Sequence, residues 1–85
     1  MDNKVLVDLV IPEMNQSFDV YLPINKKVGN IIILLNKAIH ELSNGIYPLS
    51  KENKLYNVTT RNMYSPDVLL ANTDIRNGTK LVMVF

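Results

Sequence analysis

The chain has 85 residues, 47% of them hydrophobic and 20% charged, which is typical of one small globular domain. Nine Lys and Arg residues against eight Asp and Glu residues give a formal net charge of +1, too near neutral for an electrostatic nucleic-acid binder. The absence of cysteine excludes disulfides, thiol catalysis and cysteine-based metal sites, and a single histidine leaves little for acid–base catalysis. We therefore expect one non-enzymatic domain over residues 1–85, with no cofactor and no metal.

The sequence shows no targeting or membrane-spanning segment. Residues 1–4 are not followed by the apolar core and cleavage site of a secretory signal peptide. The apolar run at residues 31–35 is far shorter than the roughly 20 residues that a membrane-spanning helix needs. We expect a cytoplasmic protein that does not insert into a membrane.

Residues 4–11 predict a first strand, because they are rich in Val, Leu and Ile over a span too short for a stable helix. One face of this strand is uniformly apolar, with Val5, Val7, Leu9 and Ile11. The other face is mixed, with Lys4, Leu6, Asp8 and Val10. Residues 12–16 are polar after an initial proline and predict a turn. Residues 17–22 alternate cleanly and predict a second strand, so that the two form a hairpin with Phe18, Val20 and Leu22 inward.

From Val28 onward the apolar period changes from 2 to 3.6, which predicts a helix over residues 28–42. Its apolar stripe comprises Val28, Ile31, Ile32, Leu35, Ala38, Ile39 and Leu42. Asn36 lies off this stripe. The helix start is weakly specified, because Lys27 stands at the cap position and Gly29 costs about 1 kcal/mol relative to Ala inside a helix. Residues 43–45, Ser-Asn-Gly, mark its end.

The second half of the chain predicts shorter elements. Residues 47–53 contain a proline and polar side chains and predict a loop, and residues 55–60 predict a third strand whose inward side is left open. Residues 62–64 are a candidate for a short fourth strand. Asn77-Gly78 is a turn signal, and residues 79–85 predict the final strand.

The order of elements predicts the fold class. The longest apolar strands are the first and the last, and the helix offers one apolar stripe. Placing those two strands side by side and parallel at the sheet centre lets the helix cover one face. We therefore predict an α+β fold, a β-grasp roll in which one helix packs on a mixed sheet of four or five strands.

Residues 70–84 resemble the closing stretch of ubiquitin-like proteins, where a buried Leu and a buried Ile precede a polar turn and a strand of alternating apolar residues. The matching positions are Leu70, Ile75, Leu81 and Met83. The Ile-x-Asn-Gly-x-x-Leu pattern at residues 75–81, the Pro23-Ile24 pair ahead of the helix and the overall length resemble more closely one bacterial family. This is the YukD/EsaB family of small ubiquitin-like proteins from type VII secretion loci.

The resemblance implies a non-catalytic accessory protein whose partner is a membrane-anchored type VII secretion component. That partner is the large ATPase or a polytopic subunit. The alternative is a ubiquitin-like carrier or modifier that acts through its C-terminus. Conjugation needs a flexible Gly-Gly tail, and no glycine follows Gly78 in the sequence, so we expect the first role.

Few residues offer catalytic chemistry. His40 and its neighbour Glu41 point apart on a helix, and we expect His40 to be a solvated surface residue. Asp8 and Asp19 are positioned to face each other across the hairpin, where an exposed pair without a pocket is the expected outcome. A small enzyme would need a pocket around His40.

Apolar residues on the outer side of the sheet are the candidate protein-binding site. If Leu81 and Met83 face the helix, Val82 and Val84 face outward beside Leu6 and Val10 of the first strand, and Leu55 extends the strip. Ubiquitin-like folds use this sheet face to bind partners. The alternative is that central strands are apolar on both faces because of β-propensity alone. Ile33, on the outer face of the helix, is a second candidate.

Overall fold

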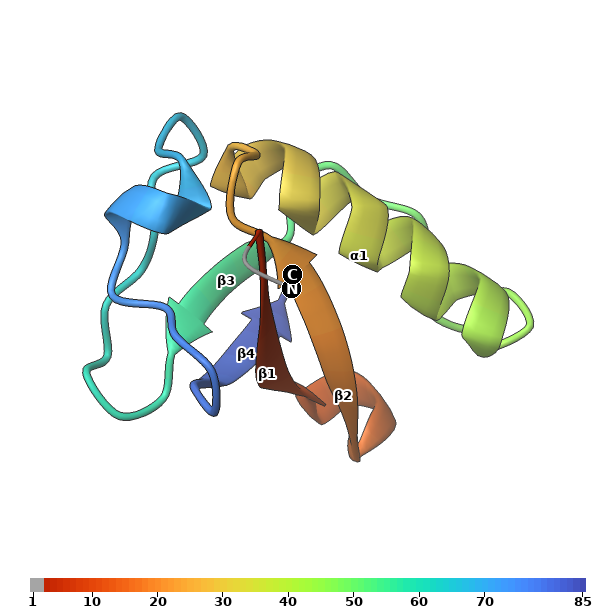
Figure 1. The fold of residues 1–85 in the computed structure, drawn as a ribbon. Helices are drawn as coiled ribbons and strands as arrows, with labels where there is room; N and C mark the ends of the chain where they lie inside the picture. Colours follow the sequence, from red (N-terminus) through yellow and green to blue (C-terminus); the bar gives the residue numbers. More distant parts are fainter. Residues whose placement is uncertain (1–2) are drawn as a thin grey trace.

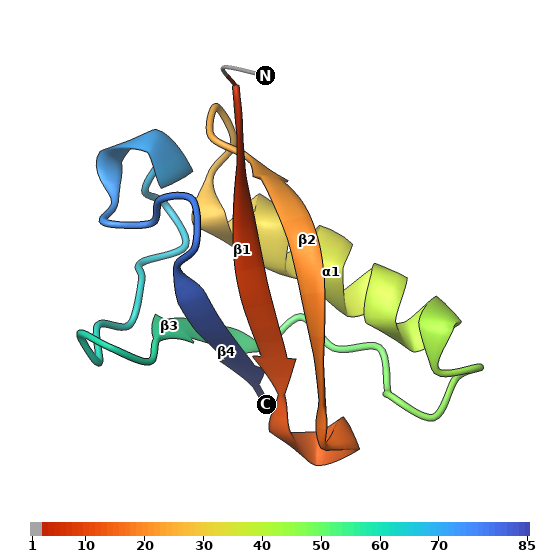
Figure 2. The ribbon, with the colours of Figure 1, turned by 60° about the horizontal axis from the view of Figure 1, so that its bottom comes forward.

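The structure is a computed structural model that describes residues 3–85 as a four-stranded sheet and one long helix (Figure 1). The strands are β1 (Lys4–Ile11), β2 (Gln16–Pro23), β3 (Lys54–Asn57) and β4 (Lys80–Val84). Helix α1 spans Val28–Leu42, and short 3-10 helices η1 (Pro12–Met14) and η2 (Leu70–Asn72) lie in the connections. Helix α1 lies across one face of the sheet, and the opposite face is left open (Figure 2).

The sheet order is β2-β1-β4-β3, so the first and last strands are neighbours at its centre. Strands β1 and β4 run parallel, with Asp8 opposite Lys80 and Val10 opposite Val82. Strands β2 and β3 flank this pair in antiparallel orientation. The prediction of an α+β β-grasp roll, with a mixed sheet and one helix, is confirmed.

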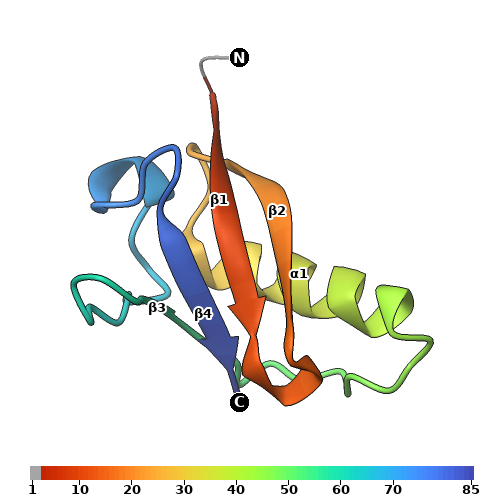
Figure 3. The same ribbon diagram turned by 90° about the horizontal axis from the view of Figure 1, so that it is seen from below.

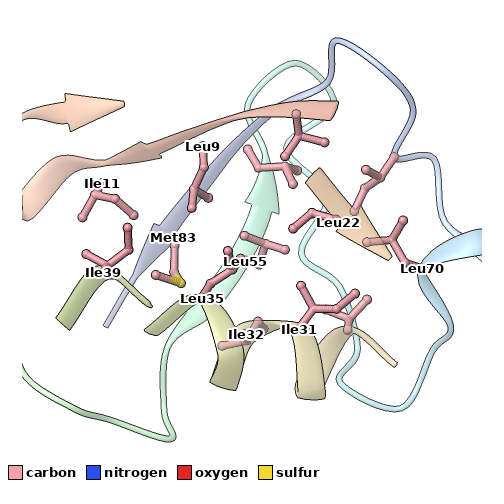
Figure 4. Close-up of a cluster of buried hydrophobic side chains, with 14 of the residues drawn as sticks. Leu9, Ile11, Leu22, Ile31, Ile32, Leu35, Ile39, Leu55, Leu70 and Met83 are labelled. Carbon is pink, nitrogen blue, oxygen red and sulfur yellow. The ribbon is translucent and has the colours of Figure 1, made fainter. Parts of the chain in front are cut away.

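The hydrophobic core fills the layer between α1 and the sheet (Figure 4). The sheet contributes Val7, Leu9, Ile11, Leu22, Leu55, Leu81 and Met83. The helix contributes Val28, Ile31, Ile32, Leu35 and Ile39, and the connections contribute Tyr47, Leu70 and Ile75. Leu70, Ile75, Leu81 and Met83, the four positions that matched the ubiquitin-like pattern, are all buried in this layer.

The third strand is shorter than predicted. Residues 55–60 were expected to be extended, but β3 ends at Asn57, whose side-chain oxygen accepts the backbone N–H groups of Thr59 and Thr60 at 2.9 and 3.2 Å. This local side-chain bonding competes with strand pairing and turns the chain. Residues 62–64 do not form a strand. Of these three residues, Met63 alone pairs, in an isolated bridge with Tyr56.

The predicted helix bounds are confirmed, but the predicted stripe is wrong at its C-terminal end. Ala38 and Leu42 are exposed, although Ile39 between them is buried, and the C-terminal end of α1 extends past the edge of the sheet (Figure 3). Asn36, expected on the polar side, is buried. The buried face of the helix is therefore rotated towards Asn36 and the segment that follows the helix.

The weakly specified start of α1 is stabilised by a distant segment rather than by a side-chain cap. The Val28 N–H donates to the Val68 carbonyl oxygen and the Gly29 N–H to the Pro66 carbonyl oxygen, both at 2.9 Å. These bonds satisfy donors that a helix N-terminus leaves without intrahelical partners. The approach is so close that a Cβ atom on Gly29 would lie 2.9 Å from Pro66 Cβ and 3.0 Å from its carbonyl oxygen.

We predict that Gly29→Ala destabilises the protein, although helix propensity alone would favour it by about 1 kcal/mol. The proline ring is rigid, so overpacking should lower the free energy of unfolding by about 1–3 kcal/mol, measured by urea denaturation. Asn30→Ala is the matched control, because Asn30 is exposed in the same helical turn. The control should be neutral or slightly stabilising, and equal stabilisation by both substitutions would contradict the prediction.

Candidate functional site

The open face of the sheet is built from alternate residues of all four strands. On β1 these are Lys4, Leu6, Asp8 and Val10, since the residues between them pack in the core or against it. Val10 lies opposite Ser17 on β2 and opposite Val82 on β4, which in turn lies opposite Tyr56 on β3. The strand register therefore aligns one continuous row of side chains across the whole sheet.

Two further pairs extend this row into a surface. Leu6 lies opposite Tyr21, which is exposed at the β2 edge, and Val84 lies opposite Lys54 at the other end of the face. Leu6 is 36% exposed, while Val10, Val82 and Val84 are half-buried by their neighbours. We call the surface formed by these residues the open-face patch: Leu6, Val10, Tyr21, Tyr56, Val82 and Val84.

Four of the predicted binding residues, Leu6, Val10, Val82 and Val84, share this face as expected. The placement of Leu55 is wrong. Leu55 is 0% exposed and packs under α1, because the antiparallel register pairs it with the inward-facing Met83. Tyr56 occupies the outward position instead, and Tyr21 was not predicted. The alternation in residues 17–22 already predicted that Tyr21 points outward, so the sequence contained the signal needed to include Tyr21 in the binding surface.

A row of charged residues interrupts the patch. Asp8 lies directly opposite Asp19 on β2, as expected for the hairpin, and opposite Lys80 on β4. Asp19 is exposed and Asp8 is half-buried. Across the sheet the order is Asp19 on β2, Asp8 on β1 and Lys80 on β4. This row therefore contains two carboxylates and one ammonium group.

Ile33 belongs to a different surface. It is 47% exposed and lines an open groove of about 920 Å³ between the first half of α1 and residues 51–54 and 63–67. Its apolar lining includes Ile32, Ile33, Met63, Tyr64 and Phe85. Three lysines and two acidic residues share the lining: Lys27, Lys51, Lys54, Glu52 and Asp67. Met63 and Phe85 were not predicted there, because only the fold brings them to the helix.

A buried polar network holds one wall of this groove. The Asn36 side-chain amide donates to Asn53 Oδ1 at 2.8 Å and to the Pro48 carbonyl oxygen at 3.1 Å, and its oxygen accepts the Ser50 N–H at 3.0 Å. Asn53 Nδ2 in turn donates to the Tyr47 hydroxyl at 3.0 Å. The Asn36 side chain therefore ties residues 48–53 of the loop after the helix to α1.

Tyr47 joins the same loop to the end of β4. Its ring stacks on Phe85 with centroids 4.8 Å apart, and burial together with the negative charge of Glu13 raises the pKa of its hydroxyl. His40 is half-buried rather than fully solvated, as its Nδ1 lies 2.7 Å from the Tyr47 carbonyl oxygen. A carbonyl oxygen only accepts, so Nδ1 carries the proton. His40 thus has a structural contact that accounts for its position.

A second polar cluster surrounds Asp74. Its carboxylate accepts hydrogen bonds from the Tyr64 hydroxyl, from Asn62 Nδ2 at 3.2 Å and from Thr60 Oγ1 at 3.3 Å. These donors, with Tyr64 the strongest, lower the pKa of Asp74. Burial and the bond to Asp74 raise the pKa of Tyr64 to about 12. The cluster ties residues 60–64 to the segment before the last turn.

The Asp74 cluster contains one carboxylate, and the Asn36 network contains none. Across residues 3–85, His, Asp and Glu side chains nowhere gather in the groups of three or more that could hold a metal ion. The same part of the chain contains no helix with the length and apolarity needed to cross a membrane.

Comparison with known proteins identifies the fold but not a family. No protein-family model matches the chain, and no curated protein matches it. Among solved structures, ubiquitin from Caldiarchaeum subterraneum is similar over 94% of this chain and 90% of its own, with a TM-score of 0.65 and 12% identity. The chain thus has a ubiquitin-like fold.

Two other similar structures come from larger assemblies. A chain of a toluene 4-monooxygenase complex has a TM-score of 0.76 at 12% identity and covers 96% of this chain and 98% of its own. A chain of the ESX-5 inner membrane complex has a TM-score of 0.68 at 22% identity over 98% of this chain, which spans only 21% of that chain. At these identities the similarities establish a shared fold.

We predict that Asn36→Ala lowers the free energy of unfolding by about 2–4 kcal/mol. The change leaves the Ser50 N–H, the Pro48 carbonyl and the Asn53 amide short of a partner, at about 1–3 kcal/mol for each buried group that stays unsatisfied. Hydrogen exchange should show the loss of protection concentrated in residues 47–53. Lys37→Ala, at an exposed position of the same helix, is the control and should change stability by less than about 0.5 kcal/mol.

We predict that the Asp74 cluster stabilises the protein at neutral pH and that this stabilisation is lost at acid pH. Because the folded-state pKa of Asp74 is lowered, its contribution is fully present above the unfolded-state value of 3.8 and is lost as pH falls through the folded-state pKa. Asp74→Asn should therefore be less stable than the parent chain at pH 7, with the difference shrinking below pH 4. The measurement is the urea midpoint at a series of pH values, and a difference that stayed constant down to pH 2 would contradict the prediction.

Proposed function

We propose that this chain is a non-catalytic docking protein of a bacterial type VII secretion system, a member of the YukD/EsaB family that acts in the cytoplasm. The single observation that carries this proposal is the open-face patch, an uncovered apolar surface over the two central strands of a ubiquitin-like fold. Patches of this kind on small domains commonly mark protein-interaction sites. The similarity to a chain of the ESX-5 inner membrane complex supports the choice of secretion machinery.

The partner in this proposal is a membrane-anchored secretion component, either the large ATPase or a polytopic subunit. Binding would come from shape and apolar complementarity, with charged side chains around the patch setting the orientation. The valines of the patch, Val10, Val82 and Val84, are β-branched and lie on paired strands. Their side chains lose little rotamer freedom on binding, which favours a preorganised contact.

The proposal predicts that Val84→Asp and Leu6→Asp abolish partner binding and leave the fold intact. Each change places a carboxylate in the apolar contact without entering the core, since both side chains project from the open face. Binding is measured with the immobilised chain and the purified ATPase or membrane complex of the same secretion system. Circular dichroism and urea denaturation check that the variants fold.

Ile46→Asp is the matched control, because Ile46 is an exposed apolar residue that follows α1, outside the open face. This variant should bind as the parent chain does. Ile33→Asp tests the groove separately. If both open-face variants bound normally while Ile33→Asp did not, the groove would replace the open face as the docking site.

A further inference from the structure

The opposed carboxylates Asp8 and Asp19 occupy an unusual place on the open face. They lie between two apolar rows, Leu6 with Tyr21 on one side and Val10 with Val82 on the other. Like charges directly opposite each other in an antiparallel pair are unfavourable. The free chain thus holds a local electrostatic repulsion inside the surface that is proposed to bind.

The chain itself supplies only part of a counter-charge. Lys80 neighbours Asp8 on the β4 side, whereas Asp19 lies on β2, at the edge of the sheet, with no strand beyond it. The other lysines on this face are Lys54, opposite Val84 on β3 at the far end of the patch, and Lys4, opposite Pro23 at the start of β1. The two carboxylates therefore lie together over β1 and β2, while the three ammonium groups are spread over β4, β3 and the start of β1.

We propose that the docking partner presents an arginine, flanked by apolar side chains, that seats against Asp8 and Asp19. This inference rests on the proposed function, because it names the chemistry of the partner at the same surface. A guanidinium group carries five N–H donors in a planar fork and can bridge two carboxylates, which an ammonium group does less well.

The aromatic ring beside the pair favours the same partner. Tyr21 lies two residues from Asp19 on the same face and is 64% exposed, so its ring is open to stacking. Arginine stacks on aromatic faces while its N–H groups remain free to bond in the plane. Leu6 and Val10, on either side of Asp8, would exclude water from the contact and strengthen each charge-assisted hydrogen bond.

The test compares Asp8→Asn and Asp19→Asn with Glu41→Gln, which removes a carboxylate from an exposed position of α1 outside this face. Affinity for the purified secretion ATPase or membrane complex is measured by calorimetry at low and high salt. Each Asn variant should weaken binding about tenfold and reduce its salt dependence, and Asp19→Lys should abolish it. Glu41→Gln should bind as the parent chain does.

A second measurement on the free protein separates a binding role from a structural one. If the pair is repulsive until a partner cation arrives, Asp8→Asn and Asp19→Asn should raise the urea midpoint while they weaken binding. A lower midpoint in both variants would show that the carboxylates stabilise the fold and would overturn the inference.

The outcomes also distinguish this inference from the proposed function. If Val84→Asp abolished binding while the Asn variants bound normally, the open face would be the docking site and the arginine contact would be wrong. If the parent chain bound no secretion component, the proposed function would fail and the inference with it. If the Asn variants weakened binding and a Lys in place of the partner's contacting Arg bound equally well, the contact would require a cation but not a guanidinium group.

Discussion

The parallel pairing of β1 with β4 is the constraint on which the rest of the structure depends. It joins residues from opposite ends of the chain through three register pairs, Asp8–Lys80, Leu9–Leu81 and Val10–Val82. So short a pairing needs support, and the turn before β4 provides it. The Gly78 N–H donates to the Leu6 carbonyl at 2.8 Å, and the Leu6 N–H donates to the Asn77 side chain at 2.8 Å. Gly78 has φ +88°, which favours glycine, so the turn both ends the preceding segment and fixes the register of the sheet.

That register decides what each face of the sheet displays. Side chains alternate along a strand, so a slip of one residue between β1 and β4 would exchange Val82 and Val84 for Leu81 and Met83 on the open face. The slip would also remove two buried side chains from contact with α1, at a cost of several kcal/mol by the usual value for burial of large apolar groups. Burial of one set of side chains under the helix therefore determines which side chains the open face displays.

Much of this could be predicted because it follows from periodicity. The change of period at Val28 located the helix, and the apolar alternation in the first and last strands placed them together at the sheet centre. Leu55 was misplaced because, in so short a strand, the sequence does not show which alternate residues face the helix. Only the pairing of Leu55 with the inward-facing Met83 decides it. Asn36 was assigned to solvent because its partners, at residues 48–53, reach the helix only after the chain has folded back. Contacts between segments far apart in the sequence produce no periodic pattern of apolar residues in either segment, so periodicity cannot predict them.

Stability and the proposed recognition lie on opposite sides of the same sheet. The capping of α1 by the segment around Pro66, the Asn36 network and the core all lie on the helix side, where substitutions are expected to be costly. The open face contributes backbone pairing to the fold, while its side chains project away from the core. A carboxylate can replace one of those side chains without entering the core, and an opposed Asp8–Asp19 pair can be retained at modest cost. Substitutions on this face therefore change what the surface displays without disturbing the core, which is the physical reason to test the proposed docking there.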